Sequence, residues 1–151
     1  MSANVWPPMT EQIMAPIGPF PPWARAVTRT ITDIEDPQAA SIVLLHVDLT
    51  ADSVPAEEID NQVRSHPSVQ AATEVLADTD FDFTVQGRQN SELAHAILAS
   101  IEAISIDRLY MHARRRSPTG KAVYGSTIQR VLANATVPVV VVPSSAITDA
   151  D

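Results

Sequence analysis

Short apolar runs alternate along the chain with segments in which apolar residues recur at helical spacing. Residues 12–17, 41–47 and 137–142 are apolar over almost their whole length, a pattern typical of strands covered on both faces. Residues 81–85 alternate apolar and polar side chains, which predicts a half-exposed edge strand. The pattern as a whole predicts five strands, at residues 12–17, 41–47, 81–85, 106–111 and 137–142.

Helices are predicted in each connection between these strands. One begins at Pro22 and ends at Asp36, one covers residues 55–76 with a break at Pro67, and two more begin near Asn90 and at Gly125. The apolar stripes consist of Trp23, Val27, Ile31 and Ile34; of Leu93, Ile97, Ile101 and Ile104; and of Ile128, Val131, Leu132 and Ala135. Strands that alternate with helices over short connections predict an α/β fold, a doubly wound parallel sheet with helices on both faces.

Length and composition restrict the classes of protein. The 151 residues suit one domain, which we place at 12–143, between an N-terminal extension at 1–11 and a C-terminal tail at 144–151. No apolar run approaches the roughly 18 residues of a membrane span, and the proline-rich N-terminus does not resemble a secretory signal, so we expect a cytoplasmic protein. The net charge of −8 argues against nucleic-acid binding, and the absence of cysteine excludes disulfides and thiolate chemistry.

All four glycines follow predicted strands. Gly18 follows the first strand, Gly87 the third, and Gly120 and Gly125 the fourth. In a parallel sheet these connections leave from one edge, and doubly wound folds bind their ligands at that edge, where the strand order reverses. The glycines therefore indicate a binding site, although any one of them can equally mark an ordinary turn.

Half of the basic residues lie close to the last glycines. They are Arg114, Arg115, Arg116, Lys121 and Arg130. The helix start at Gly125-Ser126-Thr127 offers backbone N–H groups, two hydroxyls and the positive end of a helix dipole, a combination that suits phosphate. The alternatives are a solvated loop for the arginines and an ordinary N-cap for Ser126.

Other motifs do not predict chemistry. The triplet Asp78, Asp80 and Asp82 resembles the start of a calcium loop but lacks its downstream glycine, and the four histidines show no paired metal-ligand spacing. Gly120-Lys121 lacks the hydroxyl of a phosphate-binding P-loop, and no nucleophile, base and orienting group assemble. We therefore expect a binding protein and lean against an enzyme.

From Ile13 to Pro143 the sequence resembles the universal stress protein (UspA-like) family. The stretches 41–47, 125–135 and 137–143 look like the second strand, last helix and last strand of that family. The resemblance implies the adenine-nucleotide alpha-hydrolase-like fold, with five parallel strands in the order 3-2-1-4-5.

The nucleotide motif of the family is glycine, two residues, glycine, nine residues, then glycine with serine or threonine. Gly125-Ser126 matches its end, whereas His112 and Arg115 stand at the other two glycine positions, and Gly18 stands where the family usually has an adenosine-binding aspartate. The resemblance implies a site for ATP or another adenine nucleotide with Mg²⁺, made by Pro16, Ile17, Gly18, Val47, Met111, His112, Arg115, Gly125, Ser126 and Thr127, with anion contacts from Arg114, Arg116 and Lys121.

The resemblance also implies a homodimer. In this topology the apolar fifth strand is a sheet edge, and an exposed edge of that kind promotes aggregation unless it is paired. Family members pair their fifth strands, which here implies an interface of Val137, Val139, Val140, Val141 and Val142. Three hypotheses follow: a nucleotide-binding sensor or switch in the stress response, a dimeric interaction module that binds no nucleotide, and a nucleotide hydrolase.

Overall fold

The computed structural model describes residues 10–49, 55–90, 92–113 and 124–143. Strands and helices follow each other as β1 Glu11–Pro16, α1 Pro21–Ile34, β2 Ala40–Asp48, α2 Ala56–Arg64, α3 Pro67–Ala77, β3 Phe83–Gln89, α4 Leu93–Ile104, β4 Arg108–Ala113, α5 Ser126–Asn134 and β5 Val139–Pro143. The helix predicted over residues 55–76 is two helices, because Pro67 begins α3 and has no N–H with which to continue α2. No helix in the described ranges is long and apolar enough to cross a membrane.

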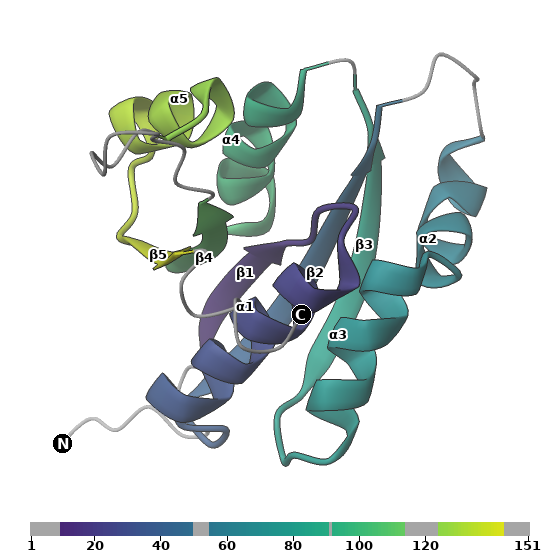
Figure 1. Ribbon diagram of the computed structural model, residues 1–151, viewed down its shortest axis with the longest axis vertical. Helices are drawn as coiled ribbons and strands as arrows, with labels where there is room; N and C mark the ends of the chain where they lie inside the picture. Colours follow the sequence, from purple (N-terminus) through teal and green to yellow (C-terminus); the bar gives the residue numbers. More distant parts are fainter. Residues whose placement is uncertain (1–9, 50–54, 91, 114–123, 144–151) are drawn as a thin grey trace, which may run out of the picture.

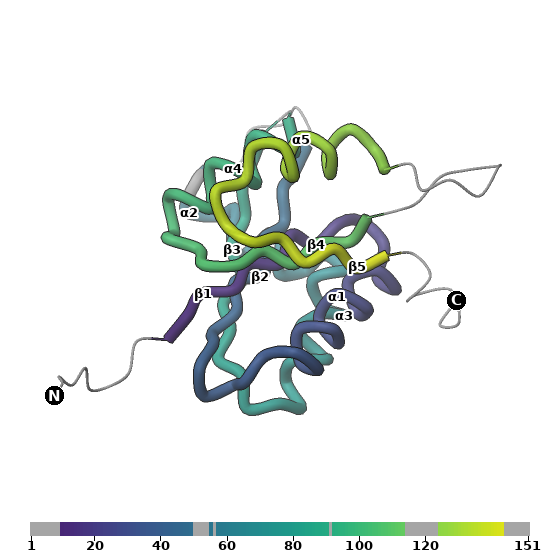
Figure 2. The backbone as a smooth tube through the Cα atoms, turned by 90° about the vertical axis from the view of Figure 1, so that its left-hand side faces the viewer, coloured from purple at the N-terminus to yellow at the C-terminus, as the bar shows by residue number. Residues whose placement is uncertain are grey.

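The five strands form one parallel sheet in the order β3-β2-β1-β4-β5, which confirms the predicted order. Helices α1, α2 and α3 supply the apolar residues that cover one face, and α4 and α5 supply those that cover the other. Figure 1 shows α4 and α5 above β4 and β5, and the turned view in Figure 2 shows β4 and β5 between these two helices and α1 with α3. The chain is therefore a three-layer α/β/α domain.

Strands β1 and β4 are joined by a short ladder. Their register contains only the pairs Ile13↔Arg108 and Met14↔Leu109, whereas β1 pairs with β2 over six residues and β4 with β5 over five. The strand order reverses at the same place, because β1 leads into α1 on one face and β4 leads into α5 on the other. Beyond Met14 and Leu109 the two strands are unpaired, and we call this stretch the β1–β4 seam.

Gly87 lies inside a strand rather than after one. The structure places β3 at Phe83–Gln89, later than the predicted 81–85, so the interpretation of Gly87 as part of a ligand-binding connection is wrong. A Cβ atom at this position would lie 2.9 Å from the backbone oxygen of Ile59 and 3.0 Å from Cγ1 of Val63. Glycine is needed here because α2 packs directly on the strand.

Two stripe residues that we expected in the core are exposed. Ile34 is 60% exposed at the last position of α1, and Leu132 is 46% exposed on α5, where Ile128 and Val131 already fill the side that faces the sheet. The N-cap of α5 is Gly125, so Ser126 is the first helical residue and not the cap.

The start of α4 also differs from the prediction. The sequence offers Asn90 or Ser91 as its N-cap, but the N-cap is Glu92. The side-chain oxygen of Asn90, two residues earlier, accepts a hydrogen bond of 2.8 Å from the Glu92 N–H.

Candidate functional site

The end of β1 is fixed against β2. The N–H of Ile17 donates to the oxygen of Leu45 at 2.7 Å, and Nδ1 of His46 lies 2.8 Å from the oxygen of Ile17. Because a carbonyl oxygen can only accept, His46 donates from Nδ1. Beyond this anchor Gly18 is exposed, and a Cβ atom added to it would meet nothing within 4 Å. The connection after β1 therefore begins with open space at Gly18, next to the hydrogen-bonded backbone of Ile17.

Val47 and Met111 lie on the opposite side of the sheet from α1. They are 7% and 6% exposed and belong to the same apolar cluster as Ile128 of α5. Tyr124, just before α5, packs against this cluster. These residues provide an apolar floor near the C-terminal edge of β2 and β4. Pro16, the last residue of β1, is half-buried.

The first turn of α5 is open for an anion. Its N-cap Gly125 makes no side-chain capping bond, and the first turn carries no acidic residue. Gly125 and Ser126 are exposed, Thr127 is half-buried, and a Cβ atom at Gly125 would meet nothing within 4 Å. The leading N–H groups of a helix have no partner within the helix and attract negative charge. This turn can hold a phosphate group.

His112 stacks on Trp23 of α1. Their ring centroids are 4.1 Å apart and their planes differ by 17°, while the ring of Phe20 lies 4.7 Å from Trp23. Side chains alternate along a strand, so His112 lies on the same face as Tyr110, which packs with α1, and not on the face of Met111 and α5. We name Phe20, Trp23 and His112 the aromatic cluster.

Neither Trp23 nor Phe20 was predicted as a site residue. Trp23 fits the apolar stripe of α1, and a stripe residue is normally assigned to the core. Its position could have indicated otherwise, because it comes five residues after Gly18, in the first turn of the helix that follows β1.

A pair of histidines lies at the same edge. The rings of His46 and His66 have centroids 4.3 Å apart, although 20 positions separate them in the sequence. His66 is the N-cap of α3 and accepts a hydrogen bond of 3.1 Å at Nδ1 from the N–H of Ser68. Burial of the ring, and next the proximity of His46, lower the pKa of His66. Within the described residues no three metal-ligating side chains come together.

The basic loop is only partly described. Arg114, Arg115, Arg116 and Lys121 lie outside the described residues, and the predictions made for them stay predictions. Arg130 is described, and it forms an exposed ion pair with Glu92 at the start of α4.

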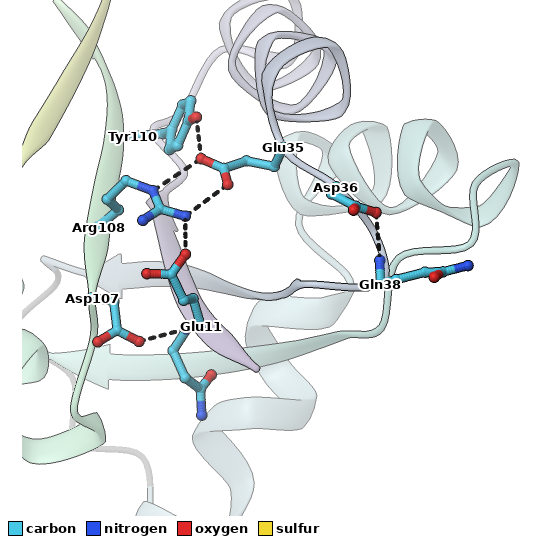
Figure 3. Close-up of polar contacts among 8 residues, drawn as sticks. Glu11, Glu35, Asp36, Gln38, Asp107, Arg108 and Tyr110 are labelled. Atoms are coloured by element: carbon cyan, nitrogen blue, oxygen red, sulfur yellow. Dashed lines mark hydrogen bonds and ion pairs between the residues drawn. The ribbon is translucent and has the colours of Figure 1, made fainter. Parts of the chain in front are cut away.

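A polar cluster at the opposite edge of the sheet surrounds Arg108, the first residue of β4, and supplies its hydrogen-bond partners (Figure 3). Arg108 donates two hydrogen bonds to the carboxylate of Glu35, at 3.0 and 2.7 Å, and one of 2.9 Å to Glu11. The hydroxyl of the buried Tyr110 donates to Glu35 at 2.5 Å. The Arg108 hydrogen bond lowers the pKa of Glu35, and burial raises that of Tyr110. The cluster joins α1, β1 and β4, far from the open turn of α5.

Comparison with known proteins extends these observations. The model of the universal stress protein family matches residues 9–143. No curated protein sequence matches the chain. Among solved structures, a universal stress protein from Archaeoglobus fulgidus superposes with a TM-score of 0.70 at 16% identity, covering 89% of this chain and 99% of that one.

Two further structures carry nucleotides. The universal stress protein from Archaeoglobus fulgidus in complex with dAMP has a TM-score of 0.64 at 12% identity, covering 87% of this chain and 97% of that one. A family protein from Arabidopsis thaliana with AMP bound has a TM-score of 0.61 at 12% identity, covering 88% and 91%. At identities this low, the similarity to these structures shows a shared fold.

Proposed function

Because the chain belongs to the universal stress protein family, we propose that it binds an adenine nucleotide at the C-terminal edge of its sheet and acts as a sensor or switch. One observation carries this proposal: the open first turn of α5 is the first part of the helix that follows β4, and the strand order reverses between β4 and β1, whose ends are unpaired. Doubly wound folds bind ligands at this point. The dAMP and AMP complexes of proteins with the same fold support it.

The phosphate has partners in this arrangement, and apolar side chains lie at the same edge of the sheet. The N–H groups at the start of α5 and the hydroxyls of Ser126 and Thr127 bind the phosphate. Val47 and Met111 supply apolar surface. ATP would bring Mg²⁺ mainly through its own phosphates, which is how that ion is usually held next to nucleotides.

The same proposal includes a homodimer through β5. Val139, Val140 and Val141 are only half-buried, although all are apolar. The oxygen of Pro138 accepts from Leu109 on β4, so the backbone groups of Val139 and Val141 point away from the sheet, toward the free edge.

The other edge of the sheet differs. At Gly87 of β3 the outward N–H donates to Asp60 at 2.7 Å, and the oxygen accepts from Arg88 at 2.8 Å. Side chains of the same protomer thus occupy part of that edge, which favours pairing through β5, where the outward backbone groups of Val139 and Val141 would form the ladder to the second copy.

A second candidate function is a dimeric interaction module that binds no nucleotide. Phe20 and Leu49 follow the adjacent strands β1 and β2 and are 54% and 52% exposed. Exposed apolar side chains at one edge also suit a protein partner.

The melting temperature with and without millimolar Mg-ATP or AMP tests the proposal. A ligand at 100 times its dissociation constant adds about 2.7 kcal/mol, which raises the melting temperature by roughly 5–10 °C for a chain of this size. Gly125→Trp is the blocked control, because the position is open and its side chain would fill the space before α5. A shift in the wild type that the control lacks supports the site; no shift at any concentration favours the interaction module.

A further inference from the structure

We propose that the aromatic cluster (Phe20, Trp23 and His112) binds the base of the nucleotide by stacking, so that the site accepts purine nucleotides without distinguishing adenine from guanine. This inference rests on the proposed function and defines its ligand class. It concerns how the base is recognised, whereas the proposed function concerns whether a nucleotide is bound.

The connection after β1 offers a base no side chain with which to hydrogen-bond. Residues 15–20 read Ala-Pro-Ile-Gly-Pro-Phe, and none of these side chains carries a donor or an acceptor. The N–H and the oxygen of Ile17 are already bonded to Leu45 and His46. Discrimination between adenine and guanine needs directed hydrogen bonds to the exocyclic groups, and this side of the site cannot provide them through its side chains.

The same connection does offer aromatic surface. Phe20 is 54% exposed. The centroid of its ring lies 4.7 Å from that of Trp23, and the centroid of Trp23 lies 4.1 Å from that of His112. Stacking on an aromatic side chain tolerates any base, because every base has a π-face. A large planar purine gains more from such a surface than a pyrimidine does.

The cluster lies at the same edge of the sheet as the open turn of α5. Phe20 and Trp23 follow β1, and His112 is the last residue but one of β4, so the three rings bridge the β1–β4 seam. The open turn of α5 follows β4 on the other face. A phosphate at α5 and a ring at the cluster are thus bound from opposite sides of one seam, and a purine nucleoside monophosphate carries both groups.

Tryptophan fluorescence tests the stacking directly. The chain has two tryptophans, so Trp6→Phe leaves Trp23 as the only reporter. In this background, AMP and GMP should both quench Trp23, with dissociation constants within about threefold of each other because stacking does not read the base. Ribose 5-phosphate, which lacks a base, should displace AMP at least about tenfold more weakly.

Phe20→Ala should weaken AMP and GMP equally, by about fivefold or more, and leave ribose 5-phosphate unchanged. The matched control is Ile34→Ala, which removes a similarly exposed apolar side chain from the other end of α1 and should change nothing.

The outcomes separate the two proposals. Unchanged AMP affinity in Phe20→Ala, or a preference for AMP over GMP of more than about tenfold, overturns the stacking inference and leaves the nucleotide site intact. Failure of calorimetry to detect AMP or GMP binding to the wild type at millimolar concentration overturns the proposed function, and the stacking inference with it. In that case Phe20 would remain as a contact for a protein partner.

Discussion

The guanidinium of Arg108 and the carboxylate of Glu35 form two hydrogen bonds, from Nε at 3.0 Å and from Nη2 at 2.7 Å. The pair joins the start of β4 to the end of α1 across 73 positions of sequence. The Glu35 side chain is only 9% exposed, whereas that of Arg108 is 24% exposed. Bidentate geometry and partial burial make this pair stronger than an ordinary surface ion pair.

Replacing Arg108 by Met should destabilise the fold. The change leaves the Glu35 carboxylate with little solvent and without its cation, which we expect to cost about 2 kcal/mol of unfolding free energy. Arg130→Met is the matched control, because the Arg130–Glu92 pair is about half exposed on both sides and its loss should cost less than about 0.5 kcal/mol. Urea denaturation of both variants measures the difference, and equal losses would contradict this account.

Stability should fall as the pH drops from 7 to 5, partly because of His66. Its pKa is lowered in the folded state, since burial and His46 disfavour the charged ring. A pKa that is lower in the folded state than in the unfolded state adds to the free energy of unfolding. This addition is complete above the unfolded-state pKa of about 6.5 and is lost as the pH falls through the folded-state pKa. Protonation at Nδ1 also removes the acceptor that caps Ser68.

The variant His66→Asn tests this contribution. Asparagine retains a side-chain acceptor for the cap and has no proton to gain, so its free energy of unfolding should decline less between pH 7 and 5. His95→Asn, at an exposed position of α4, should decline like the wild type. Identical slopes in all three proteins would show that His66 does not contribute.

Gly87→Ala should lower the melting temperature. The added methyl group would lie 2.9 Å from the backbone oxygen of Ile59, so α2 must move away from β3. Such overpacking costs about 1–3 kcal/mol, which lowers the melting temperature by roughly 2–12 °C for a chain of this length. Gly18→Ala, with nothing within 4 Å of its new methyl group, should melt within a degree or so of the wild type. Equal melting temperatures of the two variants would show that α2 can move away from β3 without loss of stability.

The proposed dimer predicts twice the monomer mass in light scattering at micromolar concentration. Val141→Pro should give a folded monomer, because it removes an N–H that points to the free edge and leaves the ladder to β4 intact. Val142 is the control position, since its backbone faces β4 and its side chain is buried. Val142→Ala should lower stability and leave the mass unchanged. A monomeric wild type would disprove the interface.

The order of the sheet was predictable because it depends on features close together in the sequence and on the family resemblance. Short apolar runs with β-branched residues, such as 41–47, favour strands, and their alternation with helices leaves few topologies. The exact position of β3 was not predictable, because it depends on how closely α2 approaches Gly87, and that approach is a tertiary property.

The position of the candidate site at the C-terminal edge of the sheet was predicted from the glycines and the family motif, and it stays a prediction. The orientation of His112 was not predictable, because it depends on Trp23, 89 positions earlier in the chain. The role of Arg108 was missed for a related reason. In the sequence, Arg108 only makes the apolar pattern of the fourth strand less clear. Its ion pairs with Glu35 and Glu11 form between residues that the folded sheet brings together.

We expect the two-pair ladder between β1 and β4 to divide the protein into unequal cooperative units. Strands β3, β2 and β1 share long ladders, as do β4 and β5, while few backbone hydrogen bonds connect the two groups. Regions joined by few such bonds open separately from the rest of a fold. Amide protons of β4 and β5 should therefore exchange with deuterium as one block, ahead of β2, and a bound nucleotide should slow that block most because it bridges the seam.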